Sequence, residues 1–103
     1  MTYGRAELLR AIRGLAEIDS RPEDPSEVAL AFEVAMLEVA RARYACLTKS
    51  ETDAAKRLDA ELEPLGLQNE RPDLWTREAV ATERVWHELR AVAGEALLVF
   101  EAA

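Results

Sequence analysis

Residues 26–63 contain neither glycine nor proline. These are the two residue types that most often end a helix, so a long stretch without them favours helix throughout. Glycine and proline number only four each among the 103 residues, while alanine, leucine, glutamate and arginine are frequent. Few β-branched or aromatic runs are available to build a sheet. The sequence therefore predicts an all-α fold, organised as a single domain over residues 1–103.

The same stretch leaves open whether residues 25–63 form one helix or two. Thr48 with Glu51, or Ser50 with Asp53, offers an N-cap and its partner three residues later, which favours a break at Thr48-Lys49-Ser50. A seven-residue apolar spacing, interrupted at Glu51, supports the alternative of one long central helix. Its members are Leu37, Tyr44, Leu58 and Leu65.

With the break, helices are expected over residues 5–17, 25–47 and 51–63, and from residue 72 or 73 to the C-terminus. Asp24 is the expected N-cap of the second helix, with Pro25 at its first position. Short connections make successive helices antiparallel. We therefore predict a four-helix antiparallel up-and-down bundle, with three helices built on one long central helix as the alternative.

The predicted helix over residues 25–47 is apolar on two sides. At about 100° per residue, its large apolar residues divide into two groups on different faces. One group is Val28, Phe32, Met36, Val39 and Cys46, and the other is Leu30, Val34, Leu37 and Tyr44. Such a helix must be covered on two sides, either at the centre of the fold or at an oligomer interface. We predict self-association, most simply as a homodimer, through Val28, Phe32, Met36 and Val39.

Acidic residues gather beside the first and third predicted loops. In an up-and-down bundle these loops share one end, so the two clusters would form one acidic pole. We define this pole as Asp19, Glu23, Asp24, Glu61, Glu63 and Glu70. Three of its members, Asp19, Glu61 and Glu63, fall at helix C-termini, where a negative charge costs roughly 0.3–1 kcal/mol. Acid placed against the helix dipole predicts a basic protein partner or a bound cation.

The overall charge excludes other classes of partner. The formal net charge is −7, so the chain lacks the basic patch that neutralises nucleic-acid phosphates, and no direct binding to DNA or RNA is expected. No apolar run approaches membrane-spanning length, and the first residues lack the apolar region of a secretion signal. We expect a cytoplasmic protein without membrane association.

Few residues could carry chemistry. His87 is the only histidine and Cys46 the only cysteine, which excludes paired-histidine metal sites and an internal disulfide. The glycines stand at isolated positions, so they form no phosphate-binding loop. We predict no catalytic residue, no metal ligand and no cofactor.

These features predict a non-catalytic acidic protein-interaction module that self-associates and binds a protein partner, as an accessory subunit, an adaptor or an inhibitor. The alternative is a small all-α enzyme or ligand-binding domain with a site between residues 25–47 and the C-terminal helix. Its candidate groups are Tyr44, Glu83, Arg84, Trp86 and His87. That alternative requires His87, and at least one of Glu83 or Arg84, to point into a cavity.

Overall fold

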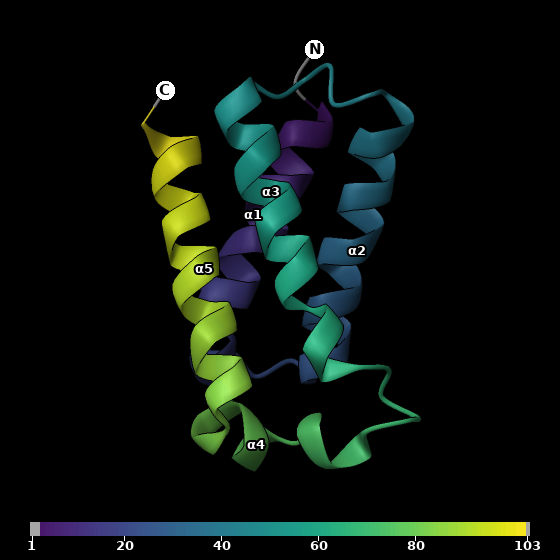
Figure 1. Ribbon diagram of the computed structural model, residues 1–103, viewed down its shortest axis with the longest axis vertical. Helices are drawn as coiled ribbons and strands as arrows, with labels where there is room; N and C mark the ends of the chain where they lie inside the picture. Colours follow the sequence, from purple (N-terminus) through teal and green to yellow (C-terminus); the bar gives the residue numbers. More distant parts are fainter. Residues whose placement is uncertain (1–2, 103) are drawn as a thin grey trace.

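Four long helices form the body of the protein in the computed structural model, which describes residues 3–102 (Figure 1). They are α1 (Tyr3–Ala16), α2 (Pro25–Arg41), α3 (Lys49–Glu61) and α5 (Arg84–Glu101). A short fifth helix, α4 (Arg77–Thr82), and three 3-10 turns complete the order: η1 (Ile18–Ser20), η2 (Glu63–Leu65) and η3 (Pro72–Leu74). Residues 3–102 contain no β-strand. The prediction of an all-α fold is confirmed.

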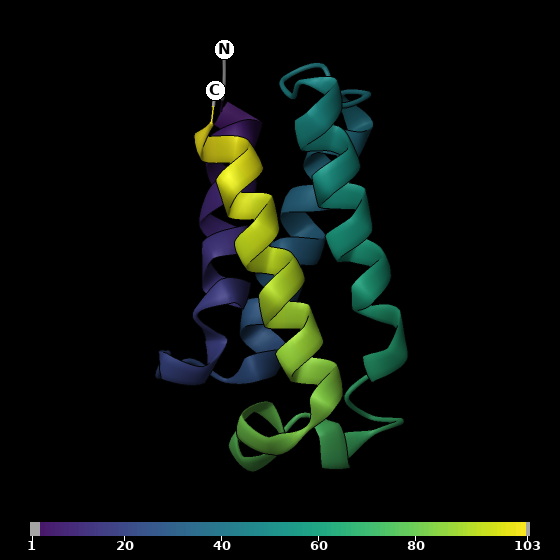
Figure 2. The same ribbon diagram turned by 60° about the vertical axis from the view of Figure 1, so that its left-hand side comes forward.

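The long helices lie side by side and successive ones run in opposite directions (Figures 1 and 2). α1 packs closely against both α2 and α5, and α5 also packs against α3 and α4. The beginning of α1 and the end of α5 lie at one end of the molecule, while α4 and the connections before α2 and after α3 lie at the other. No helix within residues 3–102 has the length and apolar character needed to span a bilayer.

Local capping sets the starts of α2 and α3. Asp24 accepts a hydrogen bond from the backbone N–H of Ser26 at 2.9 Å, with Pro25 at the first helical position. At α3, the Thr48 hydroxyl accepts from the N–H of Glu51 at 3.1 Å, and the Glu51 carboxylate accepts from the N–H of Thr48 at 3.0 Å. This capping box lies where the sequence predicts the break. The alternative of one long helix over residues 25–63 is wrong.

The second helix ends earlier than its composition suggests. We predicted helix to residue 47, but α2 ends at Arg41 and residues 42–47 form turns. Arg43 and Tyr44 adopt left-handed backbone conformations, with φ of 54° and 59°. The N–H of Tyr44 donates to the carbonyl of Val39 at 2.8 Å, which closes the turn. This tight turn lets the chain reverse before α3, and it leaves Tyr44 half-buried with the Lys56 amine 4.7 Å from its ring centroid.

The predicted C-terminal helix is also divided. An extended backbone at Glu83, with ψ of 135°, separates α4 from α5. Two side chains of α5 then bind backbone carbonyls of earlier elements: the indole N–H of Trp86 donates to Leu74, the last residue of η3, at 2.6 Å, and Arg90 donates to Val80 of α4 at 2.6 Å. These bonds hold α5 against η3 and α4, where Val80 and Trp86 are buried.

The core lies between the long helices and extends to α4. Its largest fully buried side chains are Trp86, Phe32, Leu8, Ile12, Leu15, Ile18, Leu58, Leu65, Leu89 and Val39. The contact between α1 and α2 is close at Gly14, where an added Cβ would lie 3.3 Å from a methyl carbon of Val28. A side chain at position 14 would therefore require Val28 to shift by a few tenths of an ångström.

Candidate interaction surface

The outward face of α2 carries a row of exposed apolar side chains. Leu30, Val34 and Leu37 are 57%, 55% and 55% exposed. Their spacing of four and three residues places them on one side of the helix. Phe32, which is fully buried, points in nearly the opposite direction at 100° per residue. We call Leu30, Val34 and Leu37 the outer row.

A further leucine adjoins the outer row. Leu67, in the loop after η2, is 62% exposed and lines a shallow cavity of about 250 Å³ together with Leu30 and Trp75. Five large apolar side chains are exposed in the described residues, and four of them are Leu67 and the outer row. The fifth, Leu98, lies on α5. Exposed apolar surface is therefore concentrated on one side of α2.

A groove of about 1060 Å³ runs between α1 and α2 beside the outer row. Small residues, Ala11 and Gly14 on α1 and Ala35 on α2, leave this space open, and Leu30 and Val34 contribute to its lining. Charged residues also line it: Glu7, Arg10, Arg21, Glu23, Glu27 and Glu38. The surface thus combines an apolar centre with a charged margin, the usual arrangement of a protein interface.

The charges on the exposed side of α2 differ between its two ends. Glu27 and Glu33 are exposed in its first half, and Arg41 is exposed at its end. Arg41 pairs with Glu38 at 3.4 Å, a pair in which both side chains are exposed. Such exposed pairs contribute little to stability, so Arg41 remains available to another acidic group. The face is acidic where α2 begins, and where α2 ends it carries the positive Arg41 beside the exposed Glu38.

The residues predicted for self-association are inside the single chain. Val28, Phe32, Met36 and Val39 are 8%, 0%, 7% and 1% exposed, because the other helices cover this face of α2. They cannot reach a second molecule without unfolding the core. A self-association surface on α2 has to use the outer row instead.

The sequence contained a signal that separates the two faces. Charged Glu27, Glu38 and Arg41 lie beside the outer row, whereas small Ala29 and Ala35 lie beside the buried group. Charges avoid the inside of a fold, so the charged margin marks the face that stays in solvent. Leu67 had no such signal, since nothing in the sequence places its loop beside α2.

The two segments that carry the predicted acidic pole lie at the same end of the molecule (Figures 1 and 2). A basic residue of α4 binds the first of these segments: the Arg77 guanidinium donates to the carbonyls of Arg21 at 2.6 Å and Glu23 at 3.0 Å, and also to that of Pro22. A cation therefore lies within the pole. The acidic surface is less continuous than the sequence suggests.

Local contacts account for three of the acidic residues. Asp19 lies 4.0 Å from Arg90, and Glu23 lies 3.8 Å from Arg21. Asp24 caps α2, and hydrogen bonds from the hydroxyl and the N–H of Ser26 lower the pKa of its carboxyl. Asp24 thus has a structural role that needs no partner. The long, partly exposed contacts of Asp19 and Glu23 contribute little to stability.

The remaining members, Glu61, Glu63 and Glu70, take part in no ion pair within residues 3–102. Burial raises the pKa of the neighbouring Asp59, and the negative charge of Glu63 raises it further. Within the acidic pole, the carboxylates without an ion pair are therefore those at the end of α3 and in the loop that follows. Binding of a basic partner there stays a prediction.

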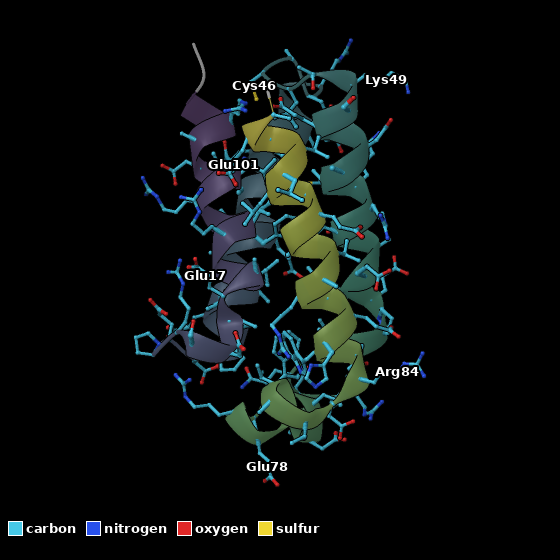
Figure 3. All side chains as sticks on the ribbon, turned by 90° about the vertical axis from the view of Figure 1, so that its left-hand side faces the viewer. Glu17, Cys46, Lys49, Glu78, Arg84 and Glu101 are labelled. Carbon is cyan, nitrogen blue, oxygen red and sulfur yellow. The ribbon has the colours of Figure 1, made fainter. Side chains whose placement is uncertain are left out.

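The alternative site near His87 does not form. His87, Glu83 and Arg84 are all exposed, and none of them lines either cavity. The Arg84 side chain points away from the body of the protein and pairs with Glu88 at 2.9 Å (Figure 3). Trp86 donates to a carbonyl next to α4, whereas Tyr44 follows α2 near the opposite end. The groups predicted for this site are not brought together.

No cluster of three or more histidine, cysteine, aspartate or glutamate side chains within residues 3–102 is arranged to hold a metal ion. The chain matches no known protein family, no curated protein and no solved structure. The outer row and its groove are the features from which a function can be argued.

Proposed function

We propose that this protein is a non-catalytic protein-interaction module and that the outer row is its contact surface. The supporting observation is the concentration of exposed apolar side chains: Leu30, Val34 and Leu37 stand together, with Leu67 beside them. Contiguous apolar surface with a polar margin is typical of protein interfaces. Full burial of one leucine or valine side chain contributes about 1.5–3 kcal/mol, so covering this row is a substantial driving force.

The shape of the surface favours a helical partner. The groove between α1 and α2 is long and open, and small residues such as Ala11 and Gly14 line it. A helix with apolar residues spaced three and four apart presents a ridge that fits such a groove. The partner we propose therefore presents an apolar helical face.

A surface variant tests this proposal. In the variant Leu30→Ser with Val34→Ser, two exposed apolar side chains become polar, and the free energy of unfolding should change by less than about 1 kcal/mol. Leu98→Ser is the matched control, because Leu98 is 70% exposed and lies on α5. Each tagged protein is used to capture binding proteins, including untagged copies of itself, from the cells that make it.

We expect the wild type and Leu98→Ser to retain the same partner in equal amounts. The double variant should retain at least tenfold less of that partner. Equal retention by all three proteins would overturn the proposal, and so would the absence of any retained protein. Thermal unfolding of each variant shows that the fold is intact.

A further inference from the structure

We infer that the partner of the outer row is a second copy of this chain, docked antiparallel with Val34 beside its own counterpart on a twofold axis. The inference rests on the proposed function and adds the identity and the orientation of the partner. Two features carry it: the distribution of charge along α2 and the spacing of the apolar side chains.

Opposite charges flank the outer row at equal distances. Glu27 and Arg41 each lie seven residues from Val34, which is two helical turns or about 10.5 Å along α2. Both side chains are exposed. A half-turn about an axis through Val34 brings Glu27 of each copy opposite Arg41 of the other. A parallel arrangement would instead oppose Glu27 to Glu27 and Arg41 to Arg41, so charge complementarity selects the antiparallel one.

The same rotation pairs the apolar side chains. Leu30 lies four residues before Val34 and Leu37 three residues after it, so Leu30 of one copy comes beside Leu37 of the other. Spacings of four and three are those of helices that pack side by side at a small crossing angle. The exposed Ala31 next to the row lets the helices approach closely, and the groove between α1 and α2 receives side chains of the second copy.

Twofold symmetry also limits the assembly to a dimer. Both copies use the same patch, so the patch is fully occupied once two chains have met, and no filament forms. α2 has 17 residues and is about 25 Å long, which makes the contact small among stable interfaces. We expect a dissociation constant in the micromolar range, on the order of 10 μM.

A charge exchange tests the orientation, with the dimer dissociation constant measured by analytical ultracentrifugation. In the antiparallel dimer, Glu27→Arg alone, or Arg41→Glu alone, places two like charges opposite one another at both ends of the contact. Each should weaken the dimer about tenfold. The combined variant restores two opposite pairs and should recover the wild-type constant to within about threefold. A parallel dimer would show no such recovery.

Matched controls change the net charge by the same amount elsewhere. Glu95→Arg and Arg57→Glu each disrupt an exposed ion pair between α3 and α5, joined at 2.8 Å. They should change the dissociation constant less than threefold. Circular dichroism confirms that every variant is folded.

The outcomes separate this inference from the proposed function. A wild-type chain that stays monomeric at about 500 μM, well above the expected constant, overturns the inference. The proposed function stands in that case if Leu30→Ser with Val34→Ser loses a partner other than this chain in the capture experiment. A dimer that does not recover in the combined charge variant overturns the antiparallel arrangement. A dimer unaffected by Leu30→Ser with Val34→Ser overturns the inference, and it overturns the proposed function as well if the capture experiment shows no loss of any other partner.

Discussion

The Glu51 carboxylate, in a residue that is only 2% exposed, accepts hydrogen bonds from Nη2 and Nε of Arg5 at 2.7 and 3.2 Å. The same guanidinium donates to the carbonyl of Phe100 at 2.8 Å. The second carboxylate oxygen of Glu51 accepts from the N–H of Thr48 and so closes the cap of α3. One ion pair thus joins α1, α3 and α5 at the end of the molecule where α1 begins.

Glu51→Gln should therefore destabilise the protein by about 2–3 kcal/mol. Removing one charge from a buried pair leaves the other charge uncompensated, although glutamine still offers an acceptor to Arg5 and Thr48. Urea unfolding measures the change. Glu95→Gln is the control, because the Glu95–Arg57 pair is exposed and should be worth less than about 1 kcal/mol. Equal losses of unfolding free energy in the two variants would show that burial of the Glu51 ion pair does not increase its contribution to stability.

The same ion pair predicts a dependence of stability on acid. Hydrogen bonds from Arg5 lower the pKa of Glu51 below its ordinary value of 4.5, against the opposing effect of burial. A lowered pKa in the folded state means that this stabilisation is complete above the ordinary pKa and is lost as the pH falls through the folded value. We expect the free energy of unfolding to decrease as the pH is lowered from 4.5. The fall should be smaller in Glu51→Gln, and an unchanged acid profile in that variant would contradict the assignment.

Asp59 should have the opposite effect. Burial, with the negative charge of Glu63, raises the pKa of the Asp59 carboxyl. A raised pKa means that the charged form costs stability above the ordinary value, and that protonation at lower pH removes the cost. Asp59 is exposed, so water screens much of this cost. Asp59→Asn should therefore stabilise the protein at pH 7 by no more than about 0.5 kcal/mol, part of it from removing a negative charge near the end of α3. Asp53→Asn, which loses a contact with Lys49 at 3.3 Å, should give no gain in thermal unfolding.

Local sequence patterns located some helix ends and missed others. Thr48 and Glu51 are a recognisable pair, and α3 begins at Lys49, within the predicted break and two residues before the predicted start at residue 51. The end of α2 is different, because Arg43 and Tyr44 take left-handed conformations that ordinary residues rarely adopt. The break at Glu83 also had no signal, because no glycine or proline stands there in the sequence. Patterns within one turn of helix therefore predict neither of these breaks.

The candidate surface could be predicted only in part from the sequence. The spacing of apolar residues correctly indicated two apolar faces on α2. The face predicted for self-association, however, is the one that is buried inside the chain. Phe32 is buried and Val34 exposed because of the helices that pack against α2, and helix periodicity alone does not identify those neighbours. The cavity beside Leu67 depends on a loop that packs near α2, which periodicity does not predict.

The capping box offers a direct test of how α3 starts. Thr48→Ala removes the hydroxyl that accepts from the N–H of Glu51 and should cost about 1 kcal/mol. Ser50→Ala is the control, because Ser50 is exposed inside α3 and alanine is the better helix former. Urea unfolding should show a loss for the first variant and no loss for the second. A similar result for both would mean that the cap is not formed in solution.

Trp75 and Trp86 form an edge-to-face pair with ring centroids 5.3 Å apart, yet their indole N–H groups differ. Trp86 donates to the carbonyl of Leu74 at 2.6 Å, whereas the buried N–H of Trp75 has no partner among the described residues. Trp86→Phe leaves the Leu74 carbonyl unpaired and opens space in the core, so it should cost about 2–4 kcal/mol. Trp75→Phe removes an unpaired donor and should cost less than about 1 kcal/mol.

Chemical denaturation of the two variants measures this difference, because both lose the same indole ring and keep an aromatic side chain. The two tryptophans differ mainly in whether the indole N–H has a hydrogen-bond partner, and Trp86 is also more buried than Trp75. Trp86→Leu, which also lacks the donor, should cost at least as much as Trp86→Phe. A loss at Trp75 as large as that at Trp86 would mean that the Trp75 N–H finds an acceptor in solution.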